Sequence, residues 1–121
     1  MNAKQFAKLL DRDNYCLHCG ETEAIAPNHR INRQMGGSKK RDGTANLVVL
    51  CSQFNGLIES NSEAAIMAKK YGWKLESWQD PLEIPVTDLC SGVAYLLDND
   101  YGRTVLVARR EQHERDKDLP A

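Results

Sequence analysis

The sequence predicts a small α+β fold, and three observations support this class. Residues 47–51 (LVVLC) form an apolar, β-branched run that is typical of a buried strand. Residues 52–73 place apolar side chains at the spacing of one helical face. Residues 92–108 have the pattern of two short strands around an Asp-Asn-Asp-Tyr-Gly turn, which predicts a hairpin. A chain of 121 residues has room for one ordinary domain.

The first half of the chain predicts a helix, a strand, a loop and a second strand. Residues 3–13 predict a short helix, because apolar side chains recur there at helical spacing. These side chains are Phe6, Leu9 and Leu10. Residues 24–32 predict a strand, and residues 34–46 predict a loop from their paired glycines and Asp-Gly step. The apolar run at 47–51 then predicts a strand on the far side of that loop.

The helix predicted over residues 52–73 has identifiable signals for its break and its end. Asn61 or Ser62 is expected to interrupt the helix or to cap it again, and Gly72 is placed to end it. Its predicted apolar face consists of Phe54, Leu57, Ile58, Ala65, Ala68 and Tyr71.

The helical spacing of apolar residues ends after this helix. Two prolines predict an extended connector over residues 76–86, and the predicted hairpin follows it. The charged residues from position 109 onward predict a frayed tail. We therefore divide the chain at residue 80. We expect residues 1–80 to carry the functional site, and residues 81–121 to form a hairpin and tail of the same compact unit.

The composition predicts a protein of the cytoplasm. No apolar run approaches the length of a membrane span, and the N-terminus lacks the apolar core of a signal peptide. The chain is 41% apolar and 27% charged, which is typical of globular domains. In a reducing compartment, its four cysteines are expected to be metal ligands or buried thiols rather than disulfides.

The net charge of −1 conceals a basic N-terminal third. Residues 1–41 carry eight Lys/Arg and four Asp/Glu, whereas the rest of the chain carries eight and thirteen. The fourteen positions after Pro27 hold five basic residues and no acidic one. These basic residues are Arg30, Arg33, Lys39, Lys40 and Arg41. A local basic run favours one polyanion site, and a solvated loop is the alternative.

The order of motifs resembles the HNH endonucleases. Cys16-x-x-Cys19 has the shape of a metal knuckle, and His29 follows on the first predicted strand. The segments RDNYCLHCG, NHRINRQMGGS, NLVVLC, LIES and YGWKL are all similar to phage-encoded members of that family. The resemblance covers residues 12–76, and it implies a ββα-metal core in which a two-stranded hairpin and a helix hold one divalent ion.

The resemblance implies a role for four residues. His29 matches the general base, which takes a proton from the attacking water and so must be neutral at working pH. Asn46 matches the central asparagine, whose side chain ties the loop between the strands. Asn28 and Asn55 match metal-ligand positions, where the family usually has His or Asp, so this chain is similar to the H-N-N variant.

The catalytic ion that the resemblance implies is Mg²⁺ or Mn²⁺, because the amide oxygens of Asn28 and Asn55 suit a hard cation. Neither ligand carries charge, so we expect the protein alone to hold the ion weakly. A DNA phosphate would complete the coordination shell.

A second metal is expected at the knuckle. Cys16, Cys19 and Cys51 supply three thiolates, one short of a closed tetrahedral zinc site. The fourth ligand is left open between Cys90, His18 and His113, with His18 expected to be poorly placed inside the knuckle. Alternatively, Phe54 fills the space with apolar packing and no zinc binds.

These expectations predict a metal-dependent DNA endonuclease acting in the cytoplasm, that of the host if a phage encodes it. The five basic residues are expected to contact phosphates of double-stranded DNA rather than bases. One alternative is a non-catalytic DNA-binding module. Another is a structural zinc module that binds protein, with phage terminase or other packaging machinery as the partner that the resemblance implies.

Overall fold

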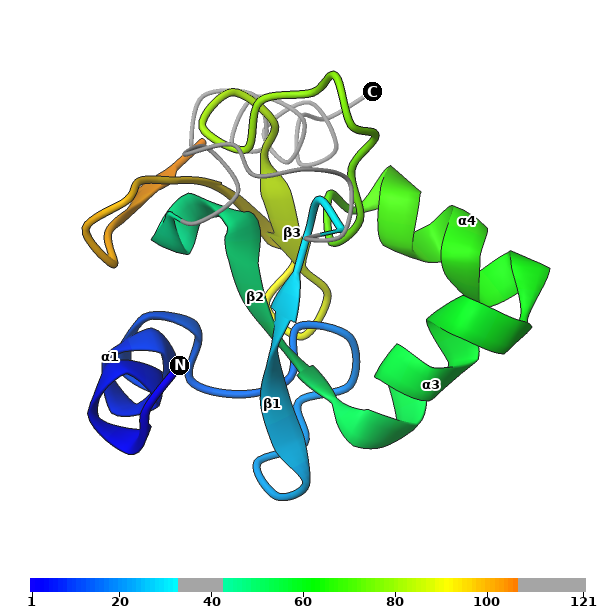
Figure 1. Ribbon diagram of the computed structural model, residues 1–121, viewed down its shortest axis with the longest axis horizontal. Helices are drawn as coiled ribbons and strands as arrows, with labels where there is room; N and C mark the ends of the chain where they lie inside the picture. The colour runs from blue at the N-terminus through cyan, green and yellow to red at the C-terminus, as the bar shows by residue number, and fades with distance from the viewer. Residues whose placement is uncertain (33–42, 107–121) are drawn as a thin grey trace, which may run out of the picture.

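The computed structural model describes residues 1–32 and 43–106. In these residues the fold is mixed α+β, with two small antiparallel sheets (Figure 1). The helical elements are α1 (Ala3–Asp13), a 3-10 turn η2 (Thr44–Asn46), α3 (Ser52–Ser60) and α4 (Ser62–Lys70). The strands are β1 (Ile25–His29), β2 (Leu47–Cys51), β3 (Val86–Asp88), β4 (Val93–Leu97) and β5 (Arg103–Val105). Within the described residues, no helix has the length and apolar character needed to cross a bilayer.

The β1–β2 hairpin lies between two groups of helices, with α1 on one face and α3 and α4 on the other (Figure 1). Every residue of β2 is buried, because successive side chains of a strand point to opposite faces. Leu47 and Val49 pack with Leu9 of α1, whereas Val48 and Leu50 pack in the cluster that contains Trp73. The strand predicted at 47–51 is confirmed, and the strand predicted at 24–32 is confirmed over residues 25–29.

Helix α1 is capped at its start and anchored at its end. Asn2 forms a capping box with Gln5, which satisfies backbone N–H groups of the first turn. At the other end, Arg12 and Asp13 form a buried ion pair at 2.7 Å. Arg12 also donates to the backbone oxygen of Thr44 at 2.9 Å, while Asp13 accepts from the backbone N–H of Val49 at 2.9 Å. This pair fixes α1 against the hairpin.

The helix predicted over 52–73 forms as two helices, α3 and α4, which meet at Asn61. The Asn61 side chain accepts from the backbone N–H of Ala64 at 3.1 Å and so caps α4. The predicted break is confirmed, but part of the predicted apolar face is wrong. Leu57 is 41% exposed, and Ala64 is buried whereas Ala65 is only partly buried, because the break changes the helical phase.

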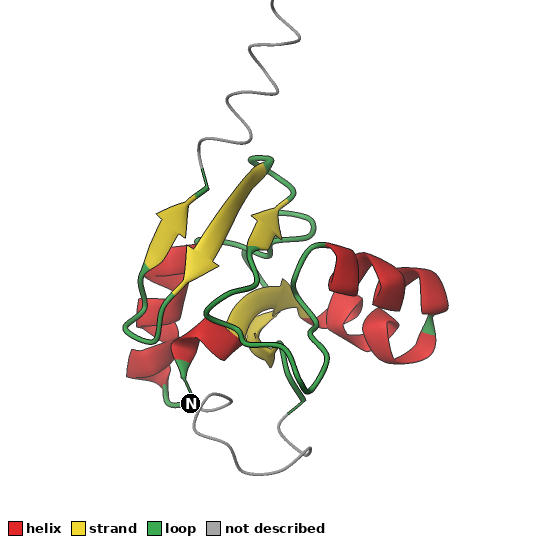
Figure 2. Ribbon diagram, turned by 90° about the horizontal axis from the view of Figure 1, so that it is seen from above, coloured by secondary structure: helices red, strands yellow, loops and turns green. Residues whose placement is uncertain are grey.

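The C-terminal part forms a three-stranded sheet in the order β3-β4-β5. The predicted hairpin is confirmed as β4 and β5, but β3 was missed. It begins at Val86, the last residue of the segment expected to be an extended connector, and its partner is β4. In Figure 2 this sheet lies above α1, while α3 and α4 project from the opposite side of the molecule. The predicted charged tail lies outside the described residues.

Candidate functional site

His29 is the last residue of β1 and lies opposite Leu47 of β2. It lines a cavity of about 300 Å³ together with residues from the start of α1, from η2 and from the β4–β5 turn. These residues are Met1, Gln5, Pro27, Thr44, Leu47 and Tyr101. The hairpin thus presents a histidine to a recess at the edge of α1, which is where a small group such as a phosphate could meet an imidazole.

Asn46 ties together the two ends of the segment between β1 and β2. Its side-chain oxygen accepts from the backbone N–H of Ile31 at 2.7 Å, and its side-chain nitrogen donates to the Ile31 carbonyl at 3.2 Å. The Asn46 backbone oxygen also accepts from Arg30 N–H at 2.8 Å. Asn46 is fully buried, so these contacts hold the segment after His29 in one position rather than meeting a substrate.

Asn28 and His29 face opposite sides of the hairpin. Asn28 pairs across the strands with Val48, which belongs to the core under α3 and α4, whereas His29 pairs with Leu47 on the α1 side. The Asn28 side-chain nitrogen is buried and has no hydrogen-bond partner among the described residues. Asn55 lies in the first turns of α3 and is partly buried.

Arg30 is buried and has no exposed surface for the phosphate contact that was predicted. Its side chain is 0% exposed and ends among four backbone carbonyls that come from separate parts of the chain. The guanidinium donates to the carbonyls of Gly72 at 2.7 Å, Ala45 at 2.8 Å, Pro81 at 2.9 Å and Ile84 at 2.6 Å. Burial lowers the pKa of Arg30 to about 9, which leaves it charged at neutral pH. Arg30 is therefore a structural clamp.

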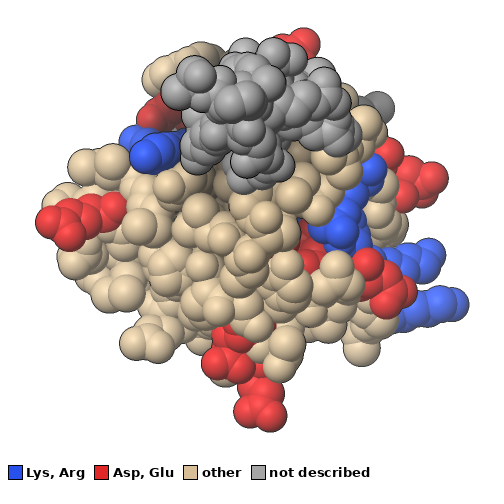
Figure 3. Space-filling view, turned by 180° about the vertical axis from the view of Figure 1, so that it is seen from behind, with Lys and Arg blue, Asp and Glu red and all other residues tan. Residues whose placement is uncertain are grey.

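The other four residues predicted to bind DNA, which are Arg33, Lys39, Lys40 and Arg41, lie outside the described residues. Their contact with phosphates stays a prediction. On the face shown in Figure 3, a broad area that is not grey carries no charged side chain, and groups of both signs lie at its margins.

Three cysteines predicted to share a metal lie together. The Cys19 and Cys51 sulfurs are 3.8 Å apart, and the backbone N–H of Cys51 donates to the Cys16 sulfur at 3.1 Å. A ring nitrogen of His18 lies within 4.8 Å of the Cys16 and Cys19 sulfurs, so these three residues could hold a metal ion. His18 could therefore join the same ion as Cys16 and Cys19, although it was expected to be poorly placed for this.

The surroundings of this cysteine cluster fit a metal that binds sulfur or nitrogen. Burial raises the pKa of Cys16 to about 11, so without a metal its thiol is protonated at neutral pH. Burial lowers the pKa of His18, which keeps its imidazole neutral and able to coordinate. The Nδ1 atom of His18 is buried without a hydrogen-bond partner among the described residues. Phe54 stacks on the His18 ring with centroids 3.9 Å apart.

Cys90 approaches the knuckle from the turn between β3 and β4. Gly20 directly follows Cys19, and a Cβ added to Gly20 would lie 3.0 Å from the Cys90 sulfur. Burial raises the pKa of Cys90, and the nearby Asp88 and Cys19 raise it further. All four cysteines are free, and Cys19 and Cys90 are both exposed. A fourth thiol is therefore available on the open side of the cluster.

Lys74 is a candidate site residue that the sequence interpretation missed. Its ammonium donates to the backbone oxygen of His29 at 2.9 Å. Burial lowers the pKa of Lys74, and the carboxylate of Glu59 on α3 opposes that shift. Lys74 lies in the segment YGWKL, which is one of the segments that carry the family resemblance, but that resemblance gave the lysine no role.

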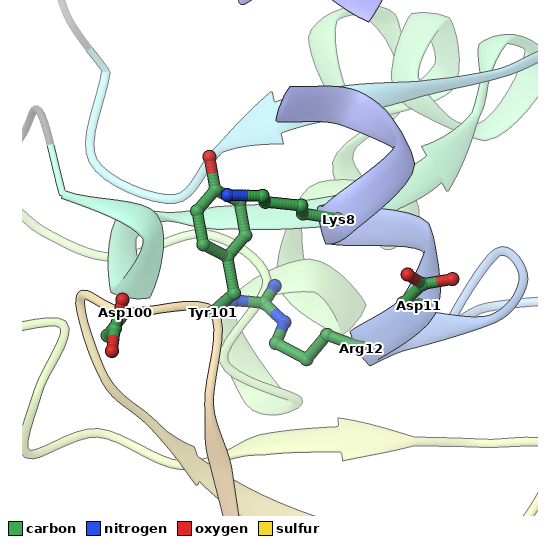
Figure 4. Close-up of a pocket in the computed structure, with 5 residues that line it drawn as sticks. All are labelled: Lys8, Asp11, Arg12, Asp100 and Tyr101. Carbon is green, nitrogen blue, oxygen red and sulfur yellow. The ribbon is translucent and has the colours of Figure 1, made fainter. Parts of the chain in front are cut away.

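A second cavity of about 330 Å³ lies between α1 and the β4–β5 turn. Figure 4 shows Lys8 beside the ring of Tyr101, with Asp11 and Asp100 on different sides of the cavity. The Lys8 ammonium lies 5.6 Å from the centroid of the Tyr101 ring. Tyr101 also lines the His29 cavity, so the two recesses meet at this ring. The mixture of both charge signs favours no particular ligand.

No protein-family model matches the chain, and no curated protein or solved structure matches it either. The resemblance to HNH endonucleases therefore depends on the residues alone.

Proposed function

We propose that this protein is an endonuclease that hydrolyses phosphodiester bonds in DNA, with His29 as its general base. The observation that carries the proposal is the position of His29 at the end of β1, lining a cavity of about 300 Å³. Asn46 supports it, because its two hydrogen bonds to Ile31 hold the segment that follows His29. The order hairpin then helix, β1-β2-α3, is also the order that the resemblance requires.

In this proposal His29 acts on the water that attacks the phosphorus atom. The imidazole takes a proton from the water as the new P–O bond forms. The bond from phosphorus to the leaving oxygen then breaks, and this oxygen takes up a proton. Asn46 acts indirectly, as a positioning residue that keeps the end of β1 in place.

A divalent ion held by the protein alone fits poorly between Asn28 and Asn55. Both side chains are neutral amides, and the buried Asn28 side-chain nitrogen has no partner in the part of the chain that the structure describes. In addition, the ammonium of Lys74 bonds the backbone oxygen of His29, the residue that follows Asn28. A positive charge here opposes a second cation. The requirement for Mg²⁺ or Mn²⁺ therefore stays a prediction.

Nicking of a supercoiled plasmid tests the proposal, with no added divalent ion, with Mg²⁺ and with Mn²⁺. We expect the wild type to nick, and His29→Ala to lower the rate by about 10²–10⁴, the usual cost of losing a general base. His113→Ala, the same substitution in the charged tail, is the matched control and should nick like the wild type. Equal rates for both variants would remove His29 from the mechanism.

The competing function is a non-catalytic DNA-binding or packaging-accessory module. The neutral residues Asn28 and Asn55 favour it, because they replace the usual charged or imidazole ligands of the similar family. The same assay decides, since DNA binding without nicking under any ion condition supports this module. Binding to phage terminase is the partner prediction that belongs to this alternative.

We also propose that zinc binds at the cysteine cluster and is coordinated by Cys16, Cys19, Cys51 and Cys90. Four thiolates make a closed tetrahedral site, in which zinc stabilises the fold. Cys90 is favoured as the fourth ligand because it reaches the cluster from a different element. His18 instead shares a turn with two of the ligands, and its ring is stacked on Phe54. Such a site would fasten the C-terminal sheet to the knuckle.

Elemental analysis of protein purified without added metal tests this site. We expect near-stoichiometric zinc in the wild type and in His18→Ala, and a clear loss of zinc from Cys90→Ala. The opposite pattern, with zinc lost only from His18→Ala, would make histidine the fourth ligand. Absence of zinc from the wild type would favour apolar packing by Phe54.

A further inference from the structure

Lys74 lies between the edge of β1 and helix α3. In the described residues, β1 pairs with β2 alone, so its other edge has no strand partner. The ammonium of Lys74 donates to the His29 oxygen on this edge at 2.9 Å. Glu59, which attracts the same ammonium, lies one helical turn after Asn55 on α3. Lys74 is therefore bonded to the strand that carries His29 and is attracted by a carboxylate of the helix that carries Asn55.

The hydrogen bonding of Lys74 is incomplete. An ammonium has three N–H donors, and the structure gives this one a single hydrogen bond and no ion pair within residues 1–32 and 43–106. Lys74 is only partly buried, so solvent or a ligand can reach it. Glu59 attracts the ammonium, and no ion pair between the two is found among the described residues.

We propose that Lys74 binds a DNA phosphate beside His29 and serves as the fixed positive charge of this site. The inference rests on the proposed function, because it assigns Lys74 to the same phosphodiester on which His29 acts. The Lys74 ammonium bonds the His29 backbone oxygen at the open edge of β1, and the His29 ring lines the cavity on the α1 side. A phosphate bound at that edge would therefore lie next to the residue that carries the ring. Lysine is suited to this role as a compact charge with several donors.

The same position has a consequence for metal binding. Two positive groups in one site repel each other, and the neutral Asn28 and Asn55 do little to offset that repulsion. Removing the Lys74 charge should therefore weaken phosphate binding and strengthen Mn²⁺ binding. A lysine that only held the strand edge would not link these two effects.

The test compares Lys74→Met with Lys70→Met, using a short DNA duplex without added divalent ions. Lys70 is an exposed lysine at the end of α4, so it controls for loss of one surface charge. We expect Lys74→Met to bind the duplex roughly 10- to 100-fold more weakly, as for loss of one charge-assisted hydrogen bond. The slope of log affinity against log salt should fall by about one unit. Lys74→Arg, which keeps the charge, should retain the slope.

An unchanged slope and affinity in folded Lys74→Met would overturn the proposal. So would a loss of thermal stability in this variant with duplex binding left intact, because that is the result of a purely structural lysine. Mn²⁺ binding, followed by its relaxation of water protons, should tighten in Lys74→Met and stay unchanged in Lys70→Met.

A second measurement uses the wild type and does not need a folded variant. The ¹⁵N resonance of the Lys74 ammonium should shift on titration with the duplex and with diethyl phosphate, a simple phosphodiester. A shift with diethyl phosphate but no binding of DNA would leave Lys74 as a phosphate site and end the proposed endonuclease. Plasmid nicking with no shift from either probe would keep the endonuclease and reject Lys74.

Discussion

Arg30 and Lys74 are two cations at the same end of β1, and they differ in how completely they are bonded. Within the described residues, Arg30 is 0% exposed and donates to four carbonyls, whereas Lys74 is partly exposed and donates to one. Burying a charge costs free energy unless hydrogen bonds offset it. The surroundings of Arg30 supply those bonds, and the surroundings of Lys74 supply them only in part.

This difference separates a structural charge from one that is available to a ligand. Arg12 belongs with Arg30, because it is buried and bonds Asp13 and the carbonyls of Thr44 and Leu47. Each arginine joins segments that are distant along the chain. Lys74 bonds the backbone of one strand, and the N–H groups that have no partner among the described residues leave room for a phosphate.

The largest effect should follow from Arg30→Met. This change leaves three buried carbonyls and one partly buried carbonyl without their donor, and each unsatisfied buried group costs about 1–3 kcal/mol. We expect the free energy of unfolding to fall by about 5 kcal/mol or more, which would unfold a marginal domain. Urea denaturation followed by circular dichroism measures it, with Lys4→Met on the exposed face of α1 as the control. Normal stability with weakened DNA binding would restore Arg30 as a phosphate contact.

A smaller but clear loss should follow from Asp13→Ala. The side chains of the Arg12–Asp13 pair are 1% and 3% exposed, so the change leaves the Arg12 guanidinium charge buried and unpaired. Breaking a buried pair in this way costs about 3–5 kcal/mol. Asp11→Ala, on the exposed side of the same helical turn, should cost little and is the matched control. Equal effects of the two substitutions on unfolding would contradict the assigned role of the pair.

The sequence predicted the elements whose signals are local. Helix α1, strand β2 and the break at Asn61 follow from apolar spacing, β-branched residues and a capping side chain, each readable within a few positions. Strand β3 was missed because its hydrogen bonds come from β4, and neighbouring prolines argued for a connector. The cysteine spacing predicted the knuckle, although the approach of Cys90 from a distant turn had no signal in its own surroundings.

The candidate site was predicted less well than the fold, and Arg30 shows why. In the sequence it belongs to a basic run, and nothing near it marks the carbonyls of Ala45, Gly72, Pro81 and Ile84 as its partners. Those partners come together only when the chain folds. Lys74 is the reverse case, because an ordinary lysine in the sequence lies against the backbone of His29 in the structure.

The smallest effect should come from the exposed pair between Lys69 and Glu76. Their nitrogen and oxygen are 2.8 Å apart, as close as the buried pair, but the side chains are 59% and 39% exposed. Water and salt screen such a pair, so it contributes about 0.2–1 kcal/mol.

Glu76→Gln is the better probe than a Lys69 variant, because Lys69 also interacts with the C-terminal dipole of α4. We expect unfolding in urea to shift by no more than about 0.5 kcal/mol at low salt. The shift should vanish at about 1 M salt, where charges are screened within about 3 Å. The Asp13→Ala effect should persist at the same salt concentration, because burial protects that pair from screening. A Glu76→Gln cost as large as that of Asp13→Ala would show that distance alone, rather than burial and completeness of bonding, sets the value of these charges.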